Sequence, residues 1–118
     1  MGDRAVINIE QGMGDYVSVY SHWAGPDMVT ILADGLADAF LSGNDRADGF
    51  LTGNIIASAV AAKRGTLGVS VGNRFDSEYP VITVRRAPNG RLVVDYQGKL
   101  VDAIDFANEH GSRSLVKL

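Results

Sequence analysis

Five segments of the chain alternate between apolar and polar residues, which is the pattern of a strand with one face buried. They cover residues 5–9, 16–21, 67–71, 80–85 and 91–96. A glycine-rich stretch, 11–15, separates the first two segments, and Pro88-Asn89-Gly90 separates the last two. Because glycine, asparagine and proline favour tight turns, each of these two pairs is predicted to form a hairpin.

Between the second and third strands, apolar residues return every three to four positions, which predicts two helices. The first is expected to start at Gly25-Pro26-Asp27, where proline and an acidic residue suit the first turn, and to end at Ser42-Gly43. The second is expected over about 45–64. Gly49 and Gly53 each weaken it by about 1 kcal/mol relative to alanine, so its first half is expected to bend or to start late.

A third, shorter helix is predicted from Val101 to Glu109, where apolar residues at helical spacing precede Gly111. The resulting order, β-β-α-α-β-β-β-α, is typical of an α+β fold whose helices pack on one face of a mostly antiparallel sheet. A chain of 118 residues with 46% hydrophobic and 21% charged residues fits a single domain over residues 1–118 with one core.

The chain contains no cysteine, which excludes a disulfide scaffold, a thiolate zinc site and a cysteine nucleophile. The sequence has no basic and apolar leader, and its apolar runs are far shorter than the roughly 20 residues that span a bilayer. We therefore expect a cytoplasmic protein with no membrane partner.

The net charge of −3 is distributed unevenly along the sequence. Residues 1–60 hold eight acidic and two basic residues, a net charge of −6, whereas residues 61–118 hold nine basic and six acidic residues, a net charge of +3. Nonspecific affinity for duplex DNA grows with the number of phosphates that a protein neutralises, so the negative total argues against a duplex-DNA partner. A small anionic ligand remains compatible with the basic second half.

Residue sets that could carry catalysis are few. The acidic residues opposite the apolar stripe of the first predicted helix are Asp27, Asp34 and Asp38. Such a helix face is expected to be solvated. His22 and His110 are far apart in the sequence, and neither accompanies a nucleophile motif. The glycines of 65–72 lack the lysine and hydroxyl residue that end a phosphate-binding P-loop. We therefore expect no enzymatic activity, no metal site and no cofactor.

The segment from Ser21 to Gly25 favours ligand binding. It joins a strand to the start of a helix and carries His22 and Trp23, the single tryptophan, beside backbone N–H groups that attract anions. The alternative is that Trp23 plugs one end of the core, as large aromatic side chains usually do.

The connection after the third predicted strand carries Asn73, Arg74 and Phe75. This set can hydrogen-bond the edge of a base, pair with a phosphate and stack on an aromatic ring. Arg64 and Arg86 are the further basic residues expected to contact phosphates. The alternatives are a solvated connection with Phe75 tucked under the sheet, and basic residues that are simply solvated.

Two motifs give the chain a resemblance to a family of small phage and prophage proteins. Met1 to Ile7 matches an opening M-G-x-R-A-V-I, and Tyr20 to Gly25 matches a Y-x-H-W-x-G element. A weaker likeness covers 68–72, whereas Ala24 and Asp27 depart from the family's pattern. The strong likeness covers about the first quarter of the chain.

The resemblance implies an accessory, counter-defence protein. Some similar small phage proteins act as sponges that sequester cyclic nucleotide alarm signals, such as the cyclic ADP-ribose isomers of Thoeris defence, and others inhibit a defence protein directly. The likeness therefore supports His22 and Trp23 as residues of a binding site.

The leading hypothesis is a noncatalytic protein that binds and sequesters a small cyclic nucleotide without cleaving it. A homo-oligomer is expected, because small chains form deep pockets most easily between subunits. The ligand-binding residues are predicted to be His22, Trp23, Arg64, Asn73, Arg74, Phe75 and Arg86. The alternatives are direct inhibition of a host defence nuclease or effector through the acidic first half, an enzyme that degrades such a signal, and a structural role in the virion.

Overall fold

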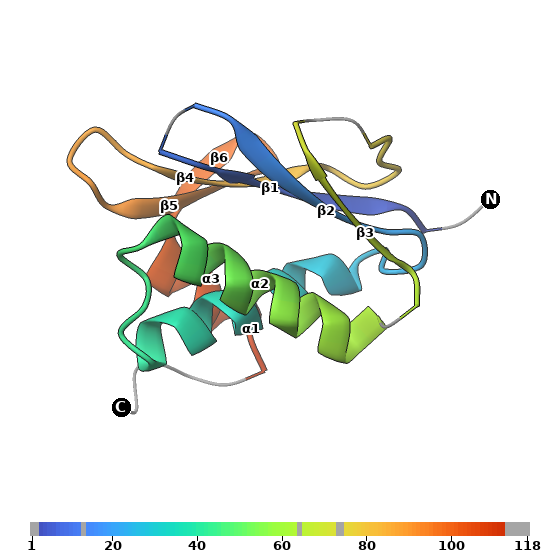
Figure 1. The fold of residues 1–118 in the computed structure, drawn as a ribbon, viewed down its shortest axis with the longest axis horizontal. Coiled ribbons are helices and arrows are strands. Elements are labelled where there is room, and N and C mark those ends of the chain that lie inside the picture. The colour runs from blue at the N-terminus through green and yellow to red at the C-terminus, as the bar shows by residue number, and fades with distance from the viewer. Residues whose placement is uncertain (1–2, 13, 64, 73–74, 113–118) are drawn as a thin grey trace.

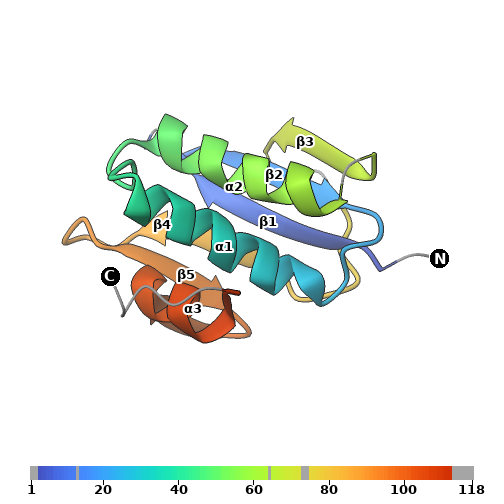
Figure 2. The ribbon, with the colours of Figure 1, turned by 90° about the horizontal axis from the view of Figure 1, so that it is seen from below.

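One sheet, covered on one face by three helices, makes up the computed structural model, which describes residues 3–12, 14–63, 65–72 and 75–112 (Figures 1 and 2). The strands in these residues are β1 (Ala5–Glu10), β2 (Tyr16–Ser21), β3 (Leu67–Val71), β4 (Ile82–Arg86), β5 (Leu92–Tyr96) and β6 (Lys99–Asp102). The helices are α1 (Asp27–Leu41), α2 (Asp48–Lys63) and α3 (Ala103–His110).

The strand order is β3-β2-β1-β4-β5-β6. Only β1 and β4 pair in parallel, and the other four neighbouring pairs are antiparallel. The predicted fold class is therefore confirmed, and so are the two predicted hairpins. The observed elements that were predicted agree with the predicted ones to within three residues at each end. Helix α2 begins at Asp48 and includes both Gly49 and Gly53, so these glycines do not delay its start.

One strand was missed, and the predicted third helix starts too early. Gln97 and Gly98 both have positive φ, 54° and 77°, and form a tight turn that returns the chain alongside β5 as β6. The helix then begins after Asp102, whose carboxylate accepts a hydrogen bond from the Ile104 backbone N–H at 2.9 Å. Val101, predicted to be helical, is the strand residue opposite Val94. A glutamine in the left-handed region is a weak turn signal, so the sequence pattern favoured the helix.

The core lies between the sheet and the helices. Its largest fully buried side chains include Ile7, Ile9, Leu32, Leu36 and Phe106. Helix α1 packs directly against α2 at Gly35, where a Cβ would lie 2.8 Å from the Ile55 Cα. The two helix backbones approach so closely only because Gly35 has no side chain.

The opposite face of the sheet is crossed by the connection from β3 to β4. These strands run in the same direction but are separated by β2 and β1, so the connection between them must pass over both strands. Phe75 stacks on Tyr20 on this face, with ring centroids 4.7 Å apart. Val6 and Ser18, which also point away from the helices, are completely buried. We call the described part of this connection, Gly72 and residues 75–81, the crossover.

Replacing Gly35 by alanine tests the close approach of α1 and α2. The new methyl group meets backbone rather than a flexible side chain, so Gly35→Ala is expected to lower the free energy of unfolding by about 1–2 kcal/mol despite its better helix propensity. The control is Gly53→Ala in α2, whose Cβ has no atom within 4 Å and which is expected to raise the free energy of unfolding by about 0.5–1 kcal/mol. Urea unfolding measures both, and equal effects of the two variants would contradict the packing.

Candidate functional site

Four aromatic side chains meet where β2 ends and the crossover passes over it. Trp23 packs edge-on against His22, with ring centroids 4.6 Å apart, and the Tyr20 hydroxyl lies 2.9 Å from His22 Nδ1. Phe75 stacks on the other side of this cluster, against Tyr20. A cavity of about 400 Å³ opens here, lined by Tyr20, His22, Trp23, Gly65, Thr66, Leu67, Gly68 and Phe75. We call it the aromatic pocket.

Local hydrogen bonds hold the segment that carries His22 and Trp23. The His22 backbone N–H donates to the Thr66 carbonyl at 3.2 Å, and the Ser21 and Thr66 hydroxyls lie 2.9 Å apart. Gly25 then turns the chain into α1 with φ of +51°, and its N–H donates to the Asp3 carbonyl at 2.7 Å. Because the segment is tied to the end of α2 on one side and to the start of β1 on the other, the two aromatic residues are held at a fixed place.

Gly68 makes room for the Phe75 ring. A Cβ at Gly68 would lie 3.3 Å from the Phe75 Cζ, and Gly68 is the cross-strand neighbour of Tyr20 in the β2–β3 pairing. Phe75 therefore packs on the sheet, as the packing alternative expects, and its ring also lines the pocket.

The indole of Trp23 does not plug the core. Its residue is 52% exposed, although the other aromatic members of the pocket are partly buried. The packing alternative for Trp23 is therefore wrong. Exposure leaves this large apolar side chain available to a ligand.

The structure does not bring Arg86 to the aromatic pocket. Its Nε forms an ion pair with Asp48 at 3.4 Å, and its two Nη groups donate to the carbonyls of Gly90 and Asp45. Arg86 thus joins the β4–β5 hairpin to the start of α2.

Three other predicted site residues, Arg64, Asn73 and Arg74, lie outside the described residues. Gly65 and Phe75, which are next to them in the sequence, line the aromatic pocket. The structure therefore unites His22, Trp23 and Phe75 of the predicted set.

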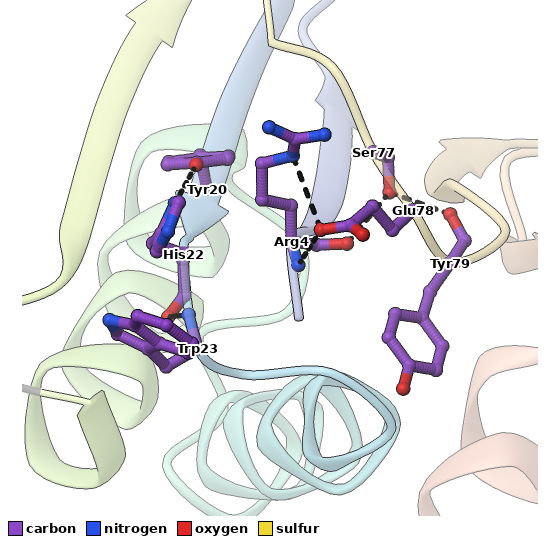
Figure 3. A network of polar contacts seen from close by, with 8 residues as sticks. Arg4, Tyr20, His22, Trp23, Ser77, Glu78 and Tyr79 are labelled. Atoms are coloured by element: carbon purple, nitrogen blue, oxygen red, sulfur yellow. Dashed lines mark hydrogen bonds and ion pairs between the residues drawn. The ribbon is translucent and has the colours of Figure 1, made fainter. Parts of the chain in front are cut away.

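Sequence reasoning missed Arg4, which stands beside the pocket. Ala5 pairs with Ser21, so Arg4 and His22 are the next positions along the same antiparallel pair. Figure 3 shows the Arg4 side chain between Tyr20 and the crossover residue Glu78, and Arg4 Nε lies 3.3 Å from Glu78 Oε1. The predicted hairpin of residues 5–9 and 16–21 carries a signal for this contact, because the pairing of its strands brings Arg4 next to His22.

Backbone contacts fix the crossover at Arg4. The Arg4 carbonyl accepts hydrogen bonds from the N–H groups of Glu78 at 2.9 Å and Tyr79 at 3.3 Å, and the Arg4 N–H donates to Glu78 Oε1 at 3.2 Å (Figure 3). These contacts place a guanidinium and a carboxylate beside Tyr20, on the side of this ring where β1 lies, and neither group lines the aromatic pocket.

The acidic face of α1 lines a separate groove between α1 and α2, with a volume of about 650 Å³. Asp27 pairs there with Lys63 at 3.1 Å, and Asp34 accepts hydrogen bonds from the Ser112 N–H and hydroxyl. Within the described part of the chain, no three His, Asp or Glu side chains are grouped so that they could hold a metal ion.

The sequence matches no protein-family model, and comparison with curated proteins and with solved structures found no similar protein. None of the described helices is both long enough and apolar enough to cross a membrane. The assignment of a function therefore depends on the pocket.

Replacing Ser18 by alanine tests how the crossover is anchored over the sheet. The buried Ser18 hydroxyl contacts Asn8 Oδ1 at 2.5 Å and donates to the Gly72 carbonyl at 2.7 Å. Without it these buried polar groups lose a partner, so Ser18→Ala is expected to lower the free energy of unfolding by about 1–3 kcal/mol in urea titrations.

The matched control is Ser70→Ala, on the strand opposite Ser18, whose exposed hydroxyl bonds only to the neighbouring Val71 carbonyl among the described residues. Its effect is expected to stay within about 0.5 kcal/mol. A Ser18→Ala protein as stable as the control would contradict the anchoring role.

Proposed function

We propose that this protein binds a small cyclic nucleotide in the aromatic pocket and sequesters it without cleavage, as a phage counter-defence protein in the cytoplasm of the host. The observation that carries the proposal is the half-exposed Trp23, held edge-on against His22 at the rim of the pocket. An indole left in water forgoes hydrophobic burial, and a rigid exposed aromatic face is a stacking platform for a base.

The polar groups of the pocket suit the edge of a base. The Tyr20 hydroxyl and His22 Nδ1 are 2.9 Å apart, and His22 Nε2 makes no hydrogen bond to any described residue. In the proposed complex the base stacks on Trp23 and His22 Nε2 hydrogen-bonds to it. The parts proposed for Arg74 and Arg64 on the phosphates, and for Asn73 on the base, are based on the sequence alone.

Sequestration is favoured over cleavage by the residues that line the pocket. The described lining residues include no carboxylate, and His22 Nδ1 is already engaged by Tyr20. General acid–base catalysis needs positioned groups that can exchange protons with the substrate. The candidates that line the pocket are His22 and Tyr20, and they are hydrogen-bonded to each other.

Trp23 is the single tryptophan, so its fluorescence reports on the pocket directly. Titration with a panel of cyclic mononucleotides, cyclic dinucleotides and cyclic ADP-ribose isomers is expected to quench it for at least one compound, and heat denaturation is expected to release that compound intact. Phe75→Ala is expected to weaken binding about tenfold, because it removes one wall of the pocket and the ring on which Tyr20 stacks.

The matched control is Phe50→Ala, which removes an exposed phenylalanine from α2 and is expected to leave quenching unchanged. Recovery of a chemically altered ligand would show that the protein is an enzyme. Absence of quenching across the panel would overturn the proposed function.

Self-association, which is part of the proposal, is supported by the exposed edge strand β3. This strand has no charged residue and no proline, and Val69 and Val71 are 52% and 65% exposed. Edge strands of monomeric proteins are usually protected by such residues, and the opposite edge strand, β6, begins with Lys99. The proposed partner is β3 of a second copy, paired antiparallel about Val69.

Val69→Lys tests this pairing, because it places two ammonium groups opposite each other at the centre of the interface. Light scattering after size-exclusion chromatography is expected to give a dimer for the wild type and a monomer for Val69→Lys. Val81→Lys, at an exposed valine before β4, is the control and is expected to remain dimeric. A wild-type protein that is monomeric at 100 μM, roughly the range in which weak dimers assemble, would rule out the β3 interface.

A further inference from the structure

The position of Arg4 suits a bound anion, and so do the N–H donors of its guanidinium that have no acceptor among the described residues. Val6 pairs with Tyr20, and Arg4, two residues before Val6, points to the same face of the sheet. The Arg4 Nε atom is buried, and its polar contact among the described residues is the ion pair with Glu78 Oε1 at 3.3 Å, which is poorly aligned for a hydrogen bond. Its two terminal Nη groups also have no hydrogen-bond acceptor among the described residues.

A guanidinium presents five N–H donors in a planar fork that matches two oxygens of a phosphate. Here the described residues offer it only one carboxylate oxygen, at ion-pair distance. Arg4 is therefore held at the side of the aromatic pocket with most of its donors unused (Figure 3).

The Glu78 carboxylate is a weak partner for this guanidinium. Both side chains are partly exposed, at 39% for Arg4 and 33% for Glu78, and exposed ion pairs contribute little to stability. Glu78 also accepts a hydrogen bond from the Arg4 backbone N–H, which orients its carboxylate without help from the guanidinium. A phosphate that accepts two hydrogen bonds from the guanidinium can therefore displace the Glu78 carboxylate from the Arg4 side chain. The hydrogen bond from the Arg4 backbone N–H to Glu78 persists.

We infer that Arg4 is the phosphate anchor of the aromatic pocket, and that Glu78 pairs with its guanidinium until a ligand phosphate replaces it. The stacking of the base on Trp23 rests on the proposed function. The binding of the phosphate rests on Arg4 and Glu78 alone. The ligand class is a nucleoside phosphate whose base stacks at Trp23 and whose phosphate lies toward β1. The affinity for the ligand then depends on competition between its phosphate and the Glu78 carboxylate for the Arg4 guanidinium.

The experiment compares adenosine, AMP and inorganic pyrophosphate on the intact protein and two variants. Trp23 fluorescence measures the binding of adenosine and of AMP. The NMR chemical shift of the Arg4 Nε–H measures the binding of pyrophosphate. AMP is expected to bind at least tenfold more tightly than adenosine. Arg4→Gln is expected to lower the affinity for AMP about tenfold and to leave the affinity for adenosine unchanged. Glu78→Gln keeps the oxygen that accepts the Arg4 N–H but removes the charge, and it is expected to tighten AMP about threefold.

Arg91→Gln and Glu109→Gln are the matched controls, because they remove an exposed arginine just before β5 and an exposed glutamate on α3. Neither is expected to change any of the three affinities. Circular dichroism checks that each variant is folded.

Equal affinities for adenosine and AMP, unchanged in Arg4→Gln, would overturn the role of Arg4 and leave the proposed function standing. Pyrophosphate binding at Arg4 without any quenching by adenosine or AMP would support the anchor and overturn the stacking of an adenine base on Trp23. Absence of both AMP and pyrophosphate binding would overturn the anchor as well.

Discussion

The parallel pairing of β1 with β4 is the constraint on which the candidate site depends. It leaves β3 and β4 on opposite sides of the β1–β2 pair, so the connection between them has to cross that pair. The helices already cover one face, and the crossover therefore runs over the other (Figure 1). Its passage buries Val6 and Ser18 and carries Phe75 onto Tyr20. The aromatic pocket is thus a consequence of strand order rather than of one contiguous motif.

Charge that is separated along the sequence is joined again by the fold. Arg4 pairs with Glu78, and Lys63 pairs with Asp27, so these contacts connect the acidic first half to the basic second half. Such partly exposed pairs add little stability individually. They do show that the segment with a net charge of −6 and the segment with a net charge of +3 touch each other in the fold. For the proposed binding of an anion, the relevant feature is that the guanidinium N–H donors of Arg4 have few acceptors among the described residues.

The site was predictable where its residues are close in the sequence. His22 and Trp23 were identified because two ring side chains sit between a strand and a helix, and Phe75 because it interrupts a polar connection. Arg4 was missed because its contact with Glu78 spans 74 positions and exists only when the crossover is in place. Arg86 was identified from its charge, but the fold directs it to acceptors on the opposite end of the sheet, because strand β4 ends beside the start of α2.

Local periodicity and turn chemistry determined the α+β class, five of the observed strands and the three helices, because these depend on spacing along the chain. The sequence by itself also placed aromatic and basic residues in two short segments. Only the tertiary structure decided that the sheet is mixed, that Gly35 lets two helix backbones touch, and that Arg4 stands beside the aromatic pocket. The physical reason is the same in each case: strand order and backbone approach are set by packing between distant residues, and periodicity carries no information about which distant residues meet.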